Sequence, residues 1–261
     1  MSHISYSEFK IWAECPYKHK LKYLDKVDEF RGNHYTAFGT AIHSVCEHKV
    51  LKEQINEEEH FEKVFFEELQ KLPQEVAEEI DQKVIDDMVV QGRQLSVLAY
   101  PFLEEYFEEY EVVSVEEKLY ENIEEFEQDG IKFKGFIDLV VKTPDGKYHV
   151  IDWKTCSWGW HSKKKADSLT TYQLTFYKYY FAQKHNIDPK KIETYFGLLK
   201  RTAKRDHVEI FRVTSGPKKT ENALNYLSKA VHNIGSNKFY KNKLSCTSGY
   251  GCEFYKTDHC K

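Results

Sequence analysis

The sequence lacks the long hydrophobic runs of a membrane protein, because nowhere in its 261 residues do eighteen apolar residues follow one another. A helix needs about 20 such residues to cross a bilayer. The first residues also lack the pattern of a signal peptide, since polar Ser2 is soon followed by the charges of Glu8 and Lys10. We therefore expect a cytoplasmic protein that does not enter a membrane.

The sequence also lacks an excess of positive charge, the usual mark of a protein that binds nucleic acid. Its 38 Lys and Arg against 42 Asp and Glu give a net charge of -4. The charges are unevenly spread, however. Glutamates crowd residues 57–127, whereas residues 161–205 carry Lys163, Lys164, Lys165, Lys184, Lys190, Lys191, Lys200, Arg201, Lys204 and Arg205. A basic face can thus exist on an acidic protein, although such runs by themselves more often mark solvated helix faces and loops.

A disulfide framework is not expected either, although the chain has six cysteines: Cys15, Cys46, Cys156, Cys246, Cys252 and Cys260. The cytoplasm keeps thiols reduced, so clustered cysteines in such a chain more often bind a metal. Three of the six lie in the polar tail, residues 236–261, which a hydrophobic core would not order by itself. We therefore expect a bound group to hold this tail, and we expect Cys46 and Cys156 to be buried or incidental.

What the sequence does contain is enough apolar material for one packed domain over residues 1–261, with 41% hydrophobic and 15% aromatic residues. Apolar residues at helical spacing predict a helix over 5–25, broken at Pro16, and another over 38–54. The spacing across 55–110 predicts a helical insertion of two or three long helices.

From residue 111 the apolar period becomes that of strands. We expect strands over 111–120, 121–128, 131–142, 147–154, 192–200 and 206–213, with helices over 168–185 and 217–234. The sequence Pro144-Asp145-Gly146 between two apolar runs predicts a hairpin turn. The fold class is therefore α/β, with a mixed central sheet flanked by helices, an N-terminal helical region and a C-terminal tail held through its cysteines.

The predicted hairpin brings two acidic residues and a lysine to one place. Asp138 and Asp152 each follow an apolar run, and Lys154 stands two residues after Asp152. Side chains alternate along a strand, so Asp152 and Lys154 share a face while Trp153 points to the other. Carboxylates bind Mg²⁺ or Mn²⁺, and a lysine can orient a metal-bound water or neutralise charge, which suits hydrolysis of a phosphodiester. A single Asp-x-Lys, however, is far more often an ordinary solvated hairpin.

Five short segments occur one after another along the chain. They are Cys15-Pro16-Tyr17-Lys18 in the first helix, Phe38-Gly39-Thr40-Ala41-Ile42-His43 with Glu47, Gly135-Phe136-Ile137-Asp138, Ile151-Asp152-Trp153-Lys154-Thr155, and Tyr172-Gln173-Leu174 with Tyr177. In this order they resemble the RecB-type exonuclease branch of the PD-(D/E)xK nuclease superfamily. The resemblance covers most of the chain outside residues 55–110 and implies a restriction-endonuclease-like core.

The resemblance implies a metal-dependent deoxyribonuclease that uses Mg²⁺ or Mn²⁺. It makes His43, Asp138 and Asp152 the metal ligands, with the main-chain carbonyl of Trp153 as a further one. Taken alone, His43 would more often be a histidine on a helix surface.

The resemblance also implies roles for residues beside the metal. Lys154 would be the catalytic lysine. Gln173 and Tyr177, one helical turn apart, would contact the DNA backbone or position Lys154. Glu117 ranks lower as an acidic residue near the site.

CRISPR-associated adaptation nucleases and AddB-like nucleases, which the sequence is similar to, hold a [4Fe-4S] cluster with four cysteines. The resemblance implies the same role for Cys15, Cys246, Cys252 and Cys260. Five residues separate Cys246 from Cys252 and seven separate Cys252 from Cys260, which is wider than in those relatives. A structural Zn²⁺, with His259 as a substitute ligand, therefore stays open as an alternative.

We interpret the chain as an exonuclease acting on single-stranded or frayed DNA ends, 5′ to 3′, in DNA repair, recombination or phage genome processing, with a helicase or recombination protein as partner. Bases could stack on aromatic residues near the site, although core packing must claim most of them: Trp153, Trp158, Trp160, Tyr172 and Tyr177. The alternatives are a structure-specific endonuclease of the same fold, a non-catalytic DNA-end-binding subunit and an iron-sulfur redox sensor. The intact set of His43, Asp138, Asp152 and Lys154 argues against the binding subunit.

Overall fold

A computed structural model of the protein describes residues 2–27, 32–127, 129–247 and 251–261. The chain divides into two compact units, each assembled from segments that are distant in sequence. The first unit contains Met1–Phe30, Leu119–Gly135 and Gly216–Lys261, and the second contains Arg31–Lys118 and Phe136–Ser215. Within the described residues, no helix is both long enough and apolar enough to cross a membrane.

The second unit is built on a mixed sheet. Its strands are β2 (Glu111–Asn122), β3 (Lys132–Lys142), β4 (Tyr148–Cys156), β5 (Ile192–Lys200) and β6 (Val208–Val213), of which β2 and β3 also extend into the first unit. β3 pairs antiparallel with β4, β4 parallel with β5, and β5 antiparallel with β6, while β2 pairs with β3. The parallel pair requires a crossover, which the helices between β4 and β5 supply.

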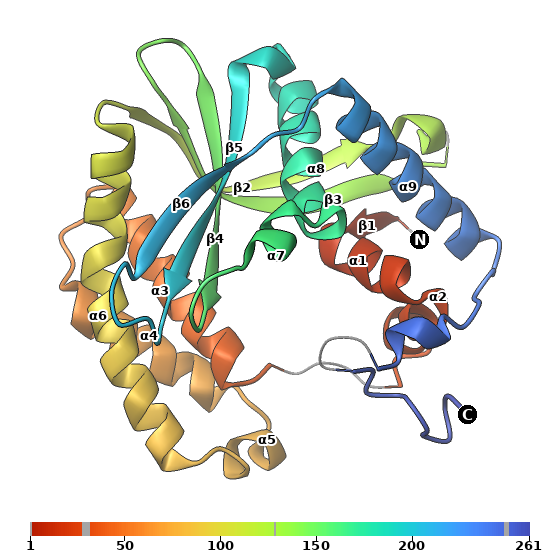
Figure 1. Cartoon of the computed structure of the whole chain (residues 1–261), viewed down its shortest axis with the longest axis horizontal. Helices are drawn as coiled ribbons and strands as arrows, with labels where there is room; N and C mark the ends of the chain where they lie inside the picture. Colours follow the sequence, from red (N-terminus) through yellow and green to blue (C-terminus); the bar gives the residue numbers. More distant parts are fainter. Residues whose placement is uncertain (1, 28–31, 128, 248–250) are drawn as a thin grey trace. The chain divides into compact units, whose positions relative to one another are not determined.

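Helices cover both faces of this sheet (Figure 1). α3 (His34–Val50), α4 (Glu57–Gln70) and α6 (Gln82–Phe107) lie on one side, with the short α5 (Gln74–Glu78) between α4 and α6. α8 (Ser168–His185) lies on the other side, preceded by the short α7 (Ser162–Ala166). Alternate strand residues such as Ile151, Trp153 and Leu199 share one buried core with α3, α4 and α6, because strand side chains alternate between faces. The predicted mixed sheet flanked by helices is confirmed.

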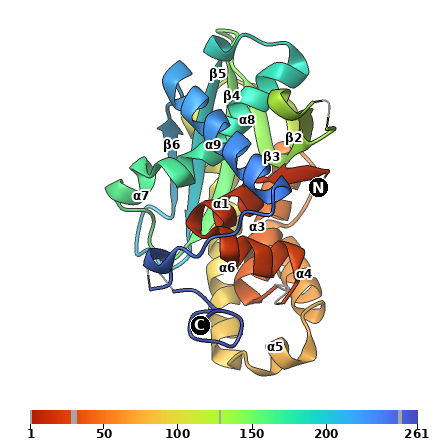
Figure 2. The ribbon, with the colours of Figure 1, turned by 90° about the vertical axis from the view of Figure 1, so that its right-hand side faces the viewer.

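The first unit combines both ends of the chain. Its short β1 (His3–Ser5) pairs parallel with the start of β3 and is followed by α1 (Tyr6–Glu14), α2 (Pro16–His19) and a π-helical turn, Lys20–Leu24. α9 (Pro217–Gly235) lies beside α1 (Figure 2), and Phe9 and Trp12 both pack edge-on against Tyr226. The predicted break at Pro16 falls at Cys15, so Pro16 occupies the first turn of α2, where its missing N–H costs nothing.

Two predicted elements differ from the structure. The strand expected over 121–128 is wrong, because β2 runs without interruption to Asn122 and a 3₁₀ turn, Glu124–Phe126, follows; residue 128 lies outside the described residues. The helix expected over 38–54 begins earlier, at His34, because the side chain of Asn33 caps it. In the C-terminal tail a single 3₁₀ turn, Lys243–Ser245, is seen among the described residues, and residues 248–250 lie outside them.

Candidate active site

Two neighbouring strands bring Asp138, Asp152 and Lys154 together in the second unit. The register that pairs Leu139 with Ile151 places Asp138 on β3 opposite Asp152 on β4. The Oδ2 atom of Asp138 accepts a hydrogen bond from the main-chain N–H of Trp153 at 2.6 Å. Lys154 Nζ lies 2.6 Å from Asp152 Oδ2. The two carboxylates and the lysine expected from the sequence therefore converge on one face of the sheet.

Trp153 anchors this arrangement from the opposite face. Its indole is buried among α3, α4 and α6, and its strand partner is Gly197. A Cβ atom at Gly197 would lie 2.3 Å from the indole ring, so only glycine leaves room for it. A tryptophan held in this way fixes β4, and strand alternation then directs Asp152 and Lys154 to the other face.

His43 reaches the same place from α3. Its Nδ1 atom lies 3.6 Å from Asp138 Oδ2, and its ring forms a hydrogen bond with the main chain of Trp153. Burial lowers the pKa of His43, and the nearby Lys154 lowers it further. The imidazole is therefore neutral near pH 7, which is the form that binds a metal.

Glu116, which the sequence did not single out, is the third side chain of the group. The described part of the chain has one set of three or more potential ligands whose ligand atoms all lie within 4.8 Å of one another: His43, Glu116 and Asp138. The backbone of Glu116 is left-handed, with φ at 48°, which interrupts the alternation of β2 and turns this carboxylate toward the site. Nothing in the periodicity predicts such a bulge, and only the adjacent acidic pair Glu116 and Glu117 could have drawn attention to it.

Glu117 does not join that group. Its Oε1 atom accepts hydrogen bonds from Lys184 Nζ at 2.6 Å and from His185 Nε2 at 2.7 Å. Although burial opposes the shift, these hydrogen bonds lower the pKa of Glu117. Glu116, and not the Glu117 expected from the sequence, therefore lies with His43 and Asp138, because Glu117 points toward Lys184 and His185 instead.

The charges at the site do not balance. Burial raises the pKa of Asp138 and of Asp152 to about 6, although Lys154 opposes the rise in both. Burial and the charge of Asp138 also raise the pKa of Glu116. Burial alone would lower the pKa of Lys154, but Asp152 and Asp138 raise it, so the lysine stays protonated. Three carboxylates thus share one lysine, and a divalent cation would supply the missing positive charge.

The space at the site also suits an ion. A cavity of about 10 Å³ is lined on its polar side by His43, Glu47, Glu116 and Asp138, and its remaining wall is formed by Cys46, Val50, Val115, Leu139 and Trp153. Such a volume holds about one particle of the size of a water molecule. The donor set of carboxylates and one imidazole, together with this space, fits Mg²⁺ or Mn²⁺.

Gln173 and Tyr177 on α8 support Asp152. Gln173 Nε2 donates to Asp152 Oδ1 at 2.8 Å and to the hydroxyl oxygen of Tyr177 at 3.0 Å. Both side chains are buried, and burial raises the pKa of Tyr177. Oδ1 of Asp152 therefore accepts from Gln173, whereas its buried Oδ2 lies beside Lys154 without a hydrogen bond among the described residues.

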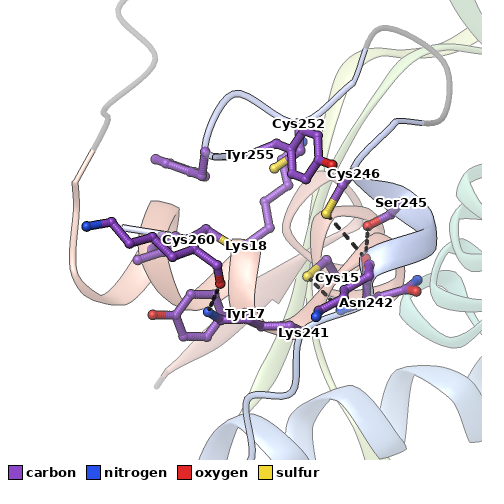
Figure 3. A pocket seen from close by; sticks show the side chains of 14 residues that line it. Cys15, Tyr17, Lys18, Lys241, Asn242, Ser245, Cys246, Cys252, Tyr255 and Cys260 are labelled. Carbon is purple, nitrogen blue, oxygen red and sulfur yellow. Dashed lines mark hydrogen bonds between the residues drawn. The ribbon is translucent and has the colours of Figure 1, made fainter. Parts of the chain in front are cut away.

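Four cysteines gather in the first unit (Figure 3). Cys15, Cys246, Cys252 and Cys260 line a cavity of about 210 Å³. Asn242 links the tail to the first helix, because its main-chain N–H donates to Cys15 Sγ at 3.3 Å and its side chain donates to the Glu14 carbonyl at 2.9 Å. The other two cysteines lie elsewhere: Cys46 is buried, which raises its pKa to about 12, and Cys156 is half-buried at the end of β4.

The aromatic residues near the site are mostly packing residues. Trp153 and Tyr177 are buried, and Trp160 packs against Phe196. Trp158 differs, because 78% of its surface is exposed.

A family model and solved structures both match this chain. The family model described as the PD-(D/E)XK nuclease superfamily matches residues 3–257. One similar crystal structure is that of a protein from Eubacterium rectale described as a candidate exonuclease. The alignment covers 98% of this chain and 89% of that protein, with 13% sequence identity and a TM-score of 0.59. The structure of the protein SSO0001 is also 13% identical and covers 97% of this chain and 84% of its own, at a TM-score of 0.42 that is too low to establish a shared fold. No curated protein matches the sequence significantly.

Proposed function

Because this chain belongs to the PD-(D/E)XK nuclease superfamily, whose members are metal-dependent nucleases, we propose that it is an exonuclease that digests DNA from its ends. We further propose that it prefers single-stranded or frayed ends, proceeds 5′ to 3′, and works with a helicase or recombination protein in DNA repair, recombination or phage genome processing. The observation that carries the proposal is the group of His43, Glu116 and Asp138 beside the Asp152–Lys154 pair.

In this proposal His43, Glu116 and Asp138 hold Mg²⁺ or Mn²⁺, and Asp152 and the Trp153 carbonyl complete the site. When bound, the metal polarises a phosphate oxygen and makes a bound water more acidic. Lys154 stays protonated beside Asp152 and stabilises the negative charge that develops on the phosphate. Gln173 and Tyr177 keep the Asp152 carboxylate in place.

The cysteines of the first unit would hold a [4Fe-4S] cluster that ties the tail to Cys15. A single zinc ion binds sulfur at about 2.3 Å, so its sulfur ligands lie within about 4 Å of one another. The four sulfur atoms do not form a set within 4.8 Å, and the cavity between them suits a larger group. Lys18, Lys241 and Lys243 also line it, and their charge would offset the negative charge of four thiolates and a cluster.

The nuclease proposal is tested by incubating end-labelled linear single-stranded, linear duplex and circular single-stranded DNA with Mg²⁺, Mn²⁺ or EDTA. Asp152→Ala and Lys154→Ala are compared with Asp145→Ala and Lys147→Ala, a second Asp-x-Lys pair at the hairpin turn that serves as a matched control. We expect metal-dependent loss of the linear strands, reduced at least about 100-fold by the first two substitutions and within about twofold by the controls.

Each other outcome has a definite meaning. Cutting of the circular strand would replace the exonuclease by a structure-specific endonuclease, and the product ladder gives the polarity. If anaerobically purified wild-type protein cuts no DNA with either metal, the catalytic proposal is wrong and a DNA-end-binding subunit takes its place.

The cluster is tested separately on anaerobically purified protein. We expect iron and inorganic sulfide in the equal amounts of a [4Fe-4S] cluster, lost in Cys15→Ser and Cys252→Ser and kept in Cys156→Ser. Zinc without sulfide would replace the cluster by a structural zinc ion. If the protein contains neither iron nor zinc, the cofactor proposal and the redox-sensor alternative are both wrong.

A further inference from the structure

Arg201, the first residue after β5, carries a half-buried positive charge for which the described part of the chain supplies no negative partner. Its guanidinium carbon lies 5.1 Å from the ring centre of Tyr35 and 5.4 Å from that of Phe38, and Nη1 donates to Gln91 Oε1 at 3.1 Å. No Asp or Glu of the described residues lies within ion-pair distance of it. Burial lowers the pKa of Arg201, and Tyr35 and Cys156 only partly offset this. A desolvated cation among neutral partners favours an anion, and a guanidinium matches the geometry of phosphate.

One face of α3 leads from the candidate metal site to Arg201. Tyr35, Gly39 and His43 are spaced four residues apart and therefore lie on one stripe of the helix. Eight residues at 1.5 Å each separate the first from the last by about 12 Å. Gly39 has no side chain, and a Cβ added there would meet Thr155 Oγ1 at 3.6 Å. The middle of the stripe therefore packs against β4.

An exposed tryptophan directly follows Ser157, the residue that links its loop to Arg201 and Thr202. The main-chain carbonyl of Ser157 accepts hydrogen bonds from the N–H and from the hydroxyl of Thr202, both at 3.0 Å. Arg201 Nη2 lies 3.5 Å from Ser157 Oγ. Trp158 follows directly, with its indole in solvent. A large, exposed aromatic side chain on a loop held in this way is suited to stack on a base.

We propose that Arg201 and Trp158 form a subsite for single-stranded DNA, in which Arg201 binds a backbone phosphate and Trp158 stacks on an unpaired base. The subsite rests on the proposed nuclease function, since it guides the strand to the metal site. Bases of a duplex are already paired and stacked, so Trp158 gives the subsite its preference for a single strand.

The test measures binding without hydrolysis, in the Lys154→Ala background with EDTA, by the anisotropy of a short fluorescent oligothymidylate over a range of salt concentrations. Arg201→Ala should weaken binding about tenfold and make the slope of log affinity against log salt about 0.7 less negative, the loss of one phosphate contact. Trp158→Ala should weaken binding about tenfold with the slope unchanged. Arg201→Lys should keep the slope, and Trp158→Phe should restore most of the affinity.

Arg205→Ala is the matched control, because it removes the same charge from the same loop at a side chain that is 92% exposed and pairs with Asp206 at 3.9 Å. It should change affinity by no more than about twofold, and a labelled duplex should bind Trp158→Ala as it binds the parent. Melting temperatures of all variants show whether each is folded, and Trp158→Ala decides the matter if Arg201→Ala does not fold.

Unchanged binding in folded Arg201→Ala or in Trp158→Ala would overturn the subsite, as would an equal loss in Arg205→Ala or equal losses with duplex. These failures are distinct from failure of the proposed function. Wild-type protein that cuts DNA while the variants bind normally refutes the subsite alone. Wild-type protein that cuts nothing, while the parent binds the strand and the variants do not, refutes the catalysis alone.

Discussion

One hairpin carries two Asp-x-Lys triplets that have the same spacing but different surroundings. The turn triplet is residues 145–147, and the strand triplet is residues 152–154. The lysine and aspartate lie 3.2 Å apart in the turn triplet and 2.6 Å apart in the strand triplet. Hydrogen bonds from Thr143 and from the main chain lower the pKa of Asp145 to about 2, whereas burial raises that of Asp152 to about 6. The same three-residue pattern therefore produces opposite electrostatic conditions.

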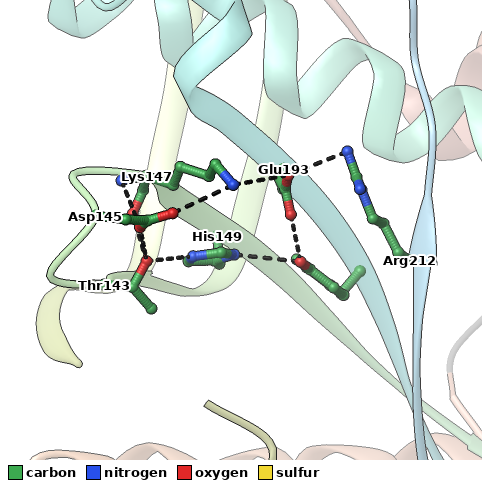
Figure 4. A network of polar contacts seen from close by, with 7 residues as sticks. Thr143, Asp145, Lys147, His149, Glu193 and Arg212 are labelled. Carbon is green, nitrogen blue, oxygen red and sulfur yellow. Dashed lines mark hydrogen bonds and ion pairs between the residues drawn. The ribbon is translucent and has the colours of Figure 1, made fainter. Parts of the chain in front are cut away.

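The surroundings explain the difference. The turn triplet belongs to a polar network at the far end of the same strands, in which Glu193 contacts Lys147 at 3.7 Å and Arg212 at 3.1 Å (Figure 4). His149 joins through Thr143, at 2.8 Å. Each carboxylate there has a cation and hydrogen-bond donors, so the network is complete without a ligand. The strand triplet belongs to a group with too few cations, which is the condition for binding one.

The largest expected effect separates the two groups by function. Asp138→Asn removes a carboxylate that faces His43 and should reduce both nuclease rate and Mn²⁺ affinity at least about 100-fold. Asp145→Asn removes a carboxylate from the turn triplet and should change neither by more than about twofold. Initial rates and Mn²⁺ titrations followed by electron paramagnetic resonance measure both quantities. Equal losses in the two variants would break the comparison.

A smaller effect separates two adjacent glutamates. Glu116→Gln should weaken Mn²⁺ binding about tenfold, because it removes one charged ligand from the group with His43 and Asp138. Glu117→Gln should leave Mn²⁺ binding unchanged and lower the melting temperature, because Lys184 and His185 lose their partner. The reverse result would show that the bulge in β2 does not aim Glu116 at the metal.

A third prediction concerns two glycines: Gly197, which lies opposite the middle residue of the strand triplet, Trp153, and Gly146, the middle residue of the turn triplet. Gly197→Ala would crowd the indole of Trp153 and should lower the free energy of unfolding by about 1–3 kcal/mol, together with the nuclease rate. Gly146→Ala places a side chain at a φ of 79° and should cost about 1 kcal/mol without changing the rate of the folded protein. Gly235→Ala meets nothing within 4 Å and is the control. Urea denaturation and initial rates provide the measurements, and an unaffected Gly197→Ala would show that Trp153 does not anchor the site.

The smallest effect depends on pH. Burial by itself would raise the pKa of Glu193, but the hydrogen bond from Tyr195 and the charges of Arg212 and Lys147 lower this pKa below its usual 4.5. A depressed acid stabilises the fold above its unfolded pKa, and this contribution is lost as the pH falls through the folded value. Glu193→Gln should therefore be less stable than wild type by about 1 kcal/mol at pH 7 and equally stable once the pH is well below 4.5. A difference that persists in acid would mean that Glu193 acts through packing instead of charge.

The sequence was sufficient for features that depend on near neighbours. Strand alternation and the turn at residues 144–146 predicted that Asp138, Asp152 and Lys154 meet. Glu116 could not be predicted, because its left-handed backbone interrupts the regular alternation of β2. The neutral surroundings of Arg201 could not be predicted either, because Tyr35 of α3 and Gln91 of α6 supply them. Local pattern thus located the catalytic candidates, while their surroundings required the tertiary structure.

The interleaving of the two units has a consequence for how the protein is made. The chain passes from one unit to the other at residues 30–31, 118–119, 135–136 and 215–216, so no continuous stretch of sequence encodes either unit alone. Everything in the unit with the metal-site candidates leaves the ribosome before Gly216–Lys261, which supplies three of the four clustered cysteines. Insertion of a cofactor among those cysteines would accordingly be one of the last steps of maturation, after the catalytic residues have already been synthesised.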